Sequence, residues 1–165
     1  MEGKLLYVMA QYDEETEAKF NKIQKALYDA GFVGTQTPNF PKHITLGSFD
    51  LDKESELIDK VKEICSNTKK IKISFDSIGL FGMEVLFIAP TVTHELLDLQ
   101  ENFNYNHQNN YNWVAHTTLL VDNPEAIQKA LPTVAQNFSS FTGYIESISL
   151  YEFSPSRFIL EEKLL

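Results

Sequence analysis

Apolar and polar residues alternate along the chain with two different periods, and the period changes in a regular order. Residues 4–11 form an apolar run that is typical of a buried strand. Asp13 then precedes a segment that reaches about Ala30 with apolar residues at helical spacing, and Gly31 follows it. A loop containing glycine and proline leads to a second strand at His43. The chain therefore begins with the order strand, helix, strand.

The pattern continues with another helix and a long strand, and the whole series then repeats. Asp52 is a candidate cap for the second helix, and residues 70–81 read as the long strand. Within that strand, apolar residues occupy every second position, and near Ser77 they switch to the other set of alternate positions. This switch indicates either a bulge or a change of buried face. The same phase change occurs near Ser147, in a second long strand over residues 141–153.

Residues 84–90 begin the second series as a strand, and Thr91 or Thr93 caps the helix that follows. The segment 102–112 holds six asparagines and reads as a loop that ends at a strand around His116. Asn123, followed by proline, marks the start of the next helix.

Side-chain identities indicate that the two series are a duplication. The segment LLYVMA at 5–10 aligns with VLFIAP at 85–90, and DSIGLF at 76–81 aligns with ESISLY at 146–151. We therefore predict a single domain over residues 1–165, made of two lobes related by a pseudo-two-fold axis. Repeat one covers about 4–81, repeat two about 84–153, and a final strand about 157–162.

Composition and charge narrow the classes of function. The chain has 165 residues, 43% of them hydrophobic, and a net charge of -9. With Arg157 as its single arginine, it is poorly suited to gripping long nucleic acid through many phosphates. One cysteine, Cys65, excludes an internal disulfide and is expected to be a core thiol in a reducing compartment. Because no apolar run is long enough for a membrane span or a secretory signal, we expect a cytoplasmic protein without a membrane partner.

The candidate chemistry lies in two His-x-Thr sequences at equivalent positions of the repeats. Residues i and i+2 of a strand share a face, so His43 lies beside Thr45, and His116 beside Thr118. A pseudo-two-fold axis would turn both pairs towards one cleft. Two imidazoles can then act as general base and general acid, while two hydroxyls donate to phosphoryl oxygens. This is phosphodiester chemistry by proton transfer, which requires no metal.

These motifs, HITLG at His43 and HTTLL at His116, resemble those of the 2H phosphoesterase superfamily, in its 2′-5′ RNA ligase (LigT-like) branch. The resemblance implies an α+β fold that is bilobal and duplicated, with two antiparallel sheets lining a central cleft and helices outside. It implies His43 and His116 as catalytic residues, Thr45 and Thr118 as phosphate-binding residues, and no cofactor. In relatives the second histidine usually activates water and the first protonates the leaving oxygen. Many relatives have proline before the second histidine; Ala115 occupies that position here and should face away from the cleft.

The resemblance further implies a cyclic phosphodiesterase that hydrolyses a 2′,3′-cyclic nucleotide phosphate, or acts on an RNA end or a 2′-5′ linkage. We expect a monomer whose substrate is a small nucleotide or an RNA terminus. The alternative is a non-catalytic RNA- or nucleotide-binding module of the same fold. The histidines could also be purely structural.

Several other residues are weaker candidates for the site. His94 and His107 lack any motif, and Lys42 should face away from His43 if its strand is regular. Arg157 either reaches the cleft or lies on the surface. Two further aromatic residues, Phe81 and Tyr151, either stack on a base or pack in the core.

Overall fold

The computed structural model describes residues 3–104 and 112–165, and its elements follow the order that the sequence predicts. The strands are β1 (Leu5–Tyr12), β2 (His43–Phe49), β3 (Ile71–Phe81), β4 (Val85–Pro90), β5 (Thr117–Val121), β6 (Phe141–Phe153) and β7 (Arg157–Lys163). The helices are α1 (Glu14–Asp29), α2 (Glu54–Asn67), α3 (His94–Glu101) and α4 (Pro124–Asn137), with a 3-10 turn η1 (Leu51–Lys53) before α2.

Side-chain caps start three of the helices as expected. Asp13, Thr93 and Asn123 each accept a hydrogen bond from the backbone N–H three residues later, at 3.0, 3.2 and 2.9 Å. Asp52 is not a cap, and that prediction was wrong. It lies inside η1, so α2 begins after Lys53 without a side-chain cap.

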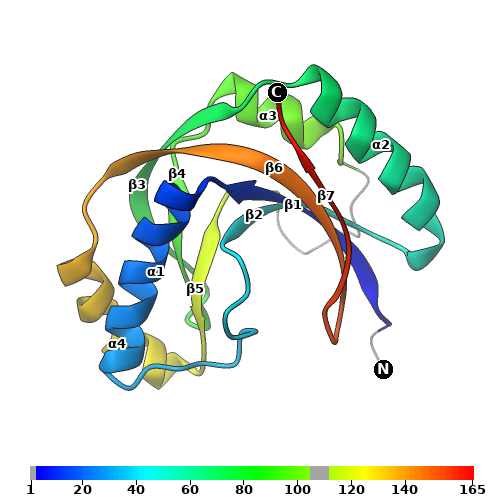
Figure 1. Ribbon diagram of the computed structural model, residues 1–165. Coiled ribbons are helices and arrows are strands. Elements are labelled where there is room, and N and C mark those ends of the chain that lie inside the picture. The colour runs from blue at the N-terminus through cyan, green and yellow to red at the C-terminus, as the bar shows by residue number, and fades with distance from the viewer. Residues whose placement is uncertain (1–2, 105–111) are drawn as a thin grey trace.

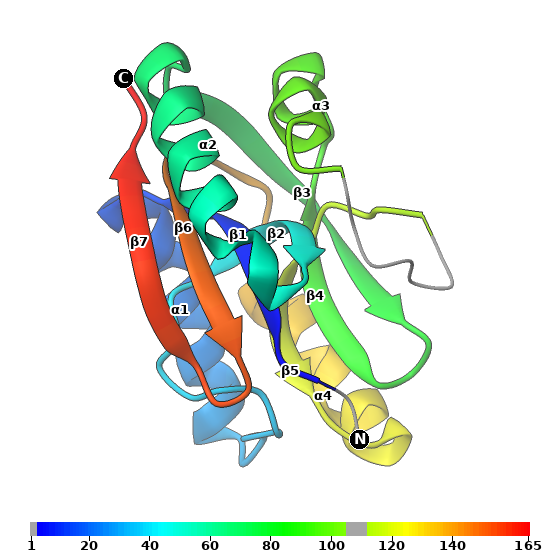
Figure 2. The ribbon, with the colours of Figure 1, turned by 90° about the vertical axis from the view of Figure 1, so that its right-hand side faces the viewer.

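All seven strands belong to one antiparallel sheet, in the order β2-β1-β6-β3-β4-β5, with β7 also paired to β6. The expectation of two separate sheets was therefore wrong. The reason is the pairing of Ile71–Phe75 in β3 with Phe141–Ile145 in β6, which joins the two halves through their long strands. Figures 1 and 2 show this sheet bent into an arch, with α1 and α4 side by side at one flank and α2 and α3 together at the other.

Strand pairing is the same in both halves of the sheet. β1 lies between β2 and the second half of β6, just as β4 lies between β5 and the second half of β3. At the junction Ile73 pairs with Gly143, which is the residue 70 positions later and therefore its repeat equivalent. A pseudo-two-fold axis through this pair would produce the observed pattern. The duplication and its boundaries stay a prediction that this pairing supports.

The phase change in the long strands is a bulge in both cases. In β3 the register shifts between Phe75 and Ser77, which leaves Asp76 as the extra residue. In β6 it shifts between Ile145 and Ser147, where Glu146 is the extra residue. The bulged acids are again 70 positions apart.

The core fills the space between the sheet and the helices. Phe20, Leu27 and Val61 from the helices are fully buried, and Cys65 is 2% exposed, as expected for a core thiol. Burial raises the pKa of the Cys65 thiol to about 11, which keeps it protonated at neutral pH. Within the two described segments, no helix is both long and apolar enough to cross a membrane.

Candidate active site

The two His-x-Thr motifs lie where the two edges of the curved sheet meet. β2 and β5 are the ends of the strand order, and they contact each other. His43 is the first residue of β2, and His116 immediately precedes β5. Both histidines and both motif threonines, Thr45 and Thr118, are partly exposed, whereas the residues that alternate with them are buried. The predicted strand faces are thus present in both motifs.

Both histidines are held in the same way. The Nδ1 atom of His43 lies 2.8 Å from the carbonyl oxygen of Pro41, and Nδ1 of His116 lies 2.7 Å from that of Val114. Each acceptor is two residues before its histidine. A carbonyl oxygen can only accept, so Nδ1 carries the hydrogen and donates it. Each neutral imidazole is thereby fixed as the tautomer with a free lone pair on Nε2.

Burial lowers the pKa of both imidazoles. For His43 it lowers the pKa to about 4, against the opposing effect of the Pro41 carbonyl. Positive charge on His116, and then on Lys42, lowers the pKa of His43 further. For His116 burial is also the main cause. Because the two rings are close enough for one charge to disfavour the other, they are suited to sharing a single proton.

A cavity of about 280 Å³ opens beside the two motifs, although His116 is not among the residues that line it. His43, Thr45 and Thr118 line it, so it combines side chains from β2 and β5. Met9 and Tyr7 of β1 form part of its floor. Its volume is just below the usual range for ligand sites, about 300–1,000 Å³, and is sufficient for a phosphate and part of a nucleotide.

Aromatic rings pack against both histidines. His116 lies with its ring centroid 4.6 Å from that of Phe81 and 5.2 Å from that of Phe87. On the other side, the rings of His43 and Phe40 are 5.4 Å apart, and Tyr151 packs on Phe40 at 4.8 Å. Phe81 and Tyr151 therefore belong to the walls around the histidines. They are not among the residues that line the cavity.

Side-chain donors join the two sheet edges across the site. Thr117 donates its hydroxyl hydrogen to the His43 carbonyl at 3.1 Å, and Trp113 donates its indole N–H to the Thr45 carbonyl at 2.9 Å. Thr117 is fully buried and also contacts the Tyr12 hydroxyl at 2.6 Å. Since Thr117 has given its hydrogen to His43, Tyr12 is the donor in that pair. We call this set of contacts the seam.

Replacing Thr117 by valine should destabilise the protein by about 1–3 kcal/mol, because the variant keeps the shape but leaves the Tyr12 hydroxyl and the His43 carbonyl without a partner. Urea unfolding at pH 7 measures this loss. Tyr12→Phe, introduced into the variant, should restore part of the loss because it removes one unpaired group. Thr142→Val is the control on an exposed strand position, with an expected change of less than about 0.5 kcal/mol. Equal losses from Thr117→Val and Thr142→Val would contradict the role of the seam.

The loop before β2 forms one wall of the cavity and is attached to β5. The backbone N–H of Thr35 donates to the Val121 carbonyl at 2.8 Å, and the Gln36 side chain accepts from the Val121 N–H at 2.8 Å. Gly34 has a φ of +73° and no room for a side chain, since a Cβ would lie 2.8 Å from the Val121 carbonyl oxygen. A loop of the first half of the chain is thus hydrogen-bonded to β5, the edge strand from the second half.

Lys42 lines the cavity next to His43, contrary to the expectation that it would face away. The strand begins only at His43, so the alternation of a regular strand does not extend to Lys42. Its backbone N–H donates to both carboxylate oxygens of Glu17, each at 3.1 Å, which fixes the direction of the chain there. Burial lowers the pKa of the Lys42 ammonium group. No local pattern signals this contact, because Glu17 lies on a helix 25 residues earlier in the chain.

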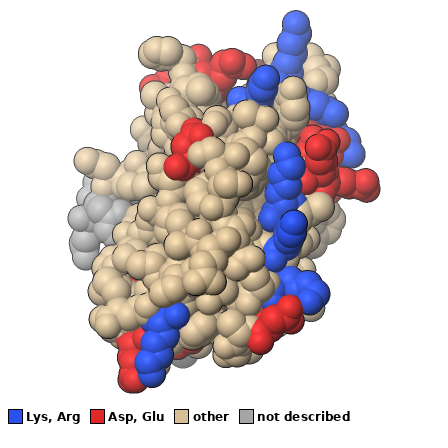
Figure 3. Space-filling model, turned by 90° about the vertical axis from the view of Figure 1, so that its left-hand side faces the viewer, with Lys and Arg blue, Asp and Glu red and all other residues tan. Residues whose placement is uncertain are grey.

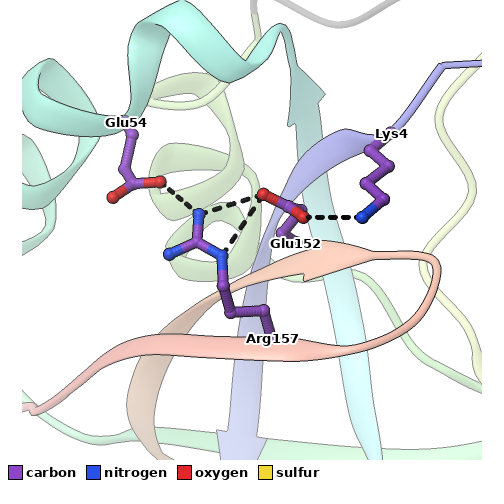
Figure 4. A network of polar contacts seen from close by, with 4 residues as sticks. All are labelled: Lys4, Glu54, Glu152 and Arg157. Atoms are coloured by element: carbon purple, nitrogen blue, oxygen red, sulfur yellow. Dashed lines mark hydrogen bonds and ion pairs between the residues drawn. The ribbon is translucent and has the colours of Figure 1, made fainter.

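Arg157 does not reach the cavity. Figure 4 shows its guanidinium between Glu54 and Glu152, with the Glu152 carboxylate 3.0 Å from Nη2 and also bridged to Lys4 at 3.7 Å. This places the arginine in a surface ion-pair network. His94 is exposed at the start of α3, and His107 lies outside the described residues.

Figure 3 shows a face whose centre is uncharged apart from one acidic group, with basic and acidic side chains gathered along one flank. The basic side chains follow one another along that flank, and acidic side chains lie beside them. In the described segments, no group of three or more His, Cys, Asp or Glu residues is placed to hold a metal ion.

The fold has several known counterparts. LigT from Escherichia coli, crystallised with 3′-AMP, aligns with a TM-score of 0.64 at 15% identity, over 99% of this chain and 99% of LigT. TT0787 from Thermus thermophilus aligns with a TM-score of 0.67 at 13% identity, over 97% of each chain. A protein described as a phosphoesterase aligns with a TM-score of 0.61 at 16% identity, over 98% and 99%.

These structural likenesses show a shared fold, since the sequences are far apart. A search of curated protein sequences gave no match. The sequence model of the 2′-5′ RNA ligase superfamily, in contrast, matches residues 12–156, which is most of the chain and includes both motifs. The protein belongs to the 2′-5′ RNA ligase superfamily, the LigT-like group of two-histidine phosphoesterases.

Proposed function

We propose that this protein hydrolyses a 2′,3′-cyclic phosphate on a small nucleotide or an RNA end, with His43 and His116 as the proton-transfer residues. The observation that carries the proposal is the matched setting of the two imidazoles. Each donates from Nδ1 to the carbonyl two residues earlier, and each has a threonine two residues later on the same face. A merely structural histidine has no need for this duplicated arrangement.

Acid–base catalysis needs one neutral and one protonated imidazole at the same time. The mutual effect of the two charges disfavours the doubly protonated state. A phosphodiester bound between the rings adds negative charge, which raises the pKa values and favours uptake of one proton. The histidine pair therefore takes up the proton that catalysis needs when the substrate binds.

In the proposed reaction, Nε2 of His116 takes a proton from water as the water oxygen attacks phosphorus. The bond from phosphorus to one ribose oxygen breaks, and that oxygen takes the proton held on Nε2 of His43. Hydroxyl groups of Thr45 and Thr118 donate to the phosphoryl oxygens as their charge increases. The product is a nucleoside monophosphate, and exchange with solvent then moves a proton from His116 back to His43.

The deciding experiment is turnover of the four nucleoside 2′,3′-cyclic phosphates in EDTA, followed by separation of the 2′- and 3′-phosphate products. We expect hydrolysis that survives chelation and gives a single isomer, because one fixed acid serves one leaving oxygen. Binding of the same nucleotides is measured in parallel by calorimetry. Binding without turnover would instead support a non-catalytic nucleotide-binding module, and loss of turnover in EDTA would contradict the proton-transfer mechanism.

A further inference from the structure

A second cavity, of about 250 Å³, adjoins the first. It lies between α1 and the loop before β2, and it shares five lining residues with the first cavity: Gln24, Tyr28, Asn39, Phe40 and Lys42. A ligand bound at His43 therefore lies next to this space. The shared aromatic rings, Tyr28 and Phe40, provide flat surfaces of the kind on which bases stack.

Three described residues have a buried side-chain N or O atom without a hydrogen-bond partner: Gln11, Ser149 and Gln24. Of these, Gln24 lines both cavities. It is 6% exposed, and its Nε2 atom has no hydrogen-bond partner among the described residues. Its place in α1 is four residues after Phe20 and three before Leu27, where helical spacing would favour an apolar residue. A buried amide donor without a partner costs stability, so its presence at the wall of two cavities indicates a ligand with an acceptor atom.

Glu17 supplies a hydrogen-bond acceptor, in contrast to the donor of Gln24. It lies seven residues before Gln24, two turns along the same face of α1 and about 10 Å away along the helix axis. Its carboxylate accepts the Lys42 backbone N–H and lines the second cavity. The cavity thus combines an amide donor, a carboxylate acceptor and the Lys42 ammonium group. The carboxylate would repel a phosphate but suits a ligand that presents N–H groups.

We propose that the second cavity binds a guanine base, belonging to the nucleotide whose phosphate lies between His43 and His116; this inference rests on the proposed function. Guanine presents two adjacent N–H donors that match a carboxylate, next to the O6 and N7 acceptors. Glu17 accepts from the two donors, Gln24 donates to O6, and Lys42 donates to O6 or N7. Adenine and cytosine offer only one amino donor, and uracil only one ring N–H.

The test is calorimetric titration of the wild-type protein with 3′-GMP, 3′-AMP, 3′-CMP, 3′-UMP and inorganic phosphate. We expect 3′-GMP to bind at least about tenfold more tightly than the other three nucleotides. Gln24→Leu and Glu17→Gln should each remove most of this preference while leaving the affinity for inorganic phosphate unchanged. Lys22→Gln, at an exposed position of α1, is the matched control and should keep the preference.

The outcomes separate this inference from the function on which it rests. Equal binding of all four nucleotides, or a preference for adenine, would overturn the guanine site while phosphate binding still supported the catalytic cavity. Failure of both phosphate and nucleotides to bind would overturn the proposed function, and the guanine site with it. Retention of the guanine preference in both Gln24→Leu and Glu17→Gln would overturn the assignment of these residues.

Discussion

Replacing His116 by alanine should lower kcat/KM for a 2′,3′-cyclic nucleotide about 10³-fold, and His43→Ala should cause a loss of the same order. Each variant lacks one of the two proton-transfer groups, so one of the two proton transfers proceeds without assistance. The double variant should be little worse than either single one, because residues that act as a unit are not additive. Initial rates with and without EDTA measure these losses.

The two histidines can also be told apart. An activated ester, such as a 2′-deoxynucleoside 3′-(p-nitrophenyl phosphate), has a leaving group that departs without a proton and no 2′-hydroxyl that could replace water as the nucleophile. His43→Ala should recover most of its activity on this substrate, whereas His116→Ala should not, since water still needs a base. Recovery by His116→Ala alone would reverse the two roles.

His94→Ala is the control, because His94 is exposed on α3 and belongs to neither motif. It should retain wild-type rates. Full activity in both His43→Ala and His116→Ala, with folding unchanged by circular dichroism, would end the catalytic assignment.

Lowering the pH from 7 to 4.5 should cost the wild-type protein about 2 kcal/mol of stability through His43 alone. Burial lowers the pKa of His43 to about 4 in the folded state, against about 6.5 in the unfolded chain. Between these values the unfolded state binds more protons, so the free energy of unfolding falls as the pH falls. The loss of stability through His43 is complete once the pH is below the pKa of the folded state. Because the ring is partly exposed, this loss is smaller than the full pKa shift would give.

The comparison with His43→Asn isolates this effect from the titration of carboxylates. Asparagine places an amide N–H near the position of Nδ1 and does not titrate. Denaturant unfolding at pH 7 and 4.5 should show the wild type losing about 2 kcal/mol relative to the variant. A stability difference that is the same at both pH values would mean that the imidazole is not held neutral by its surroundings.

The sequence predicts the orientation of the motif side chains better than their surroundings. Strand alternation is a local rule, and it correctly placed Thr45 beside His43 and Thr118 beside His116 on partly exposed faces. It also placed Ala115 away from the cleft, where it is buried in the core. Whether the two histidines and two threonines carry the chemistry stays a prediction for the experiments above.

What the sequence could not predict depends on contacts between distant segments. The continuous sheet follows from β3 pairing with β6, which no local pattern specifies. Nothing in the local sequence singles out Thr117, because its partners, Tyr12 and His43, are far from it in the chain. Gln24 is likewise not marked by any local pattern, and its place beside two cavities is seen only in the structure.

The seam has a second consequence, for the behaviour of the protein in a crowded solution. The carbonyl groups of His43 and Thr45 lie on an edge strand, where unpaired backbone groups invite a strand from another molecule. Thr117 and Trp113 donate side-chain hydrogen bonds to these two carbonyl groups. The carbonyl groups are then not available to a strand from another molecule, although β2 and β5 do not form a regular strand pair. The contacts that bring the two motifs together therefore also cover the exposed edge of β2, so one set of residues holds the candidate site in place and hinders edge-to-edge pairing with another molecule.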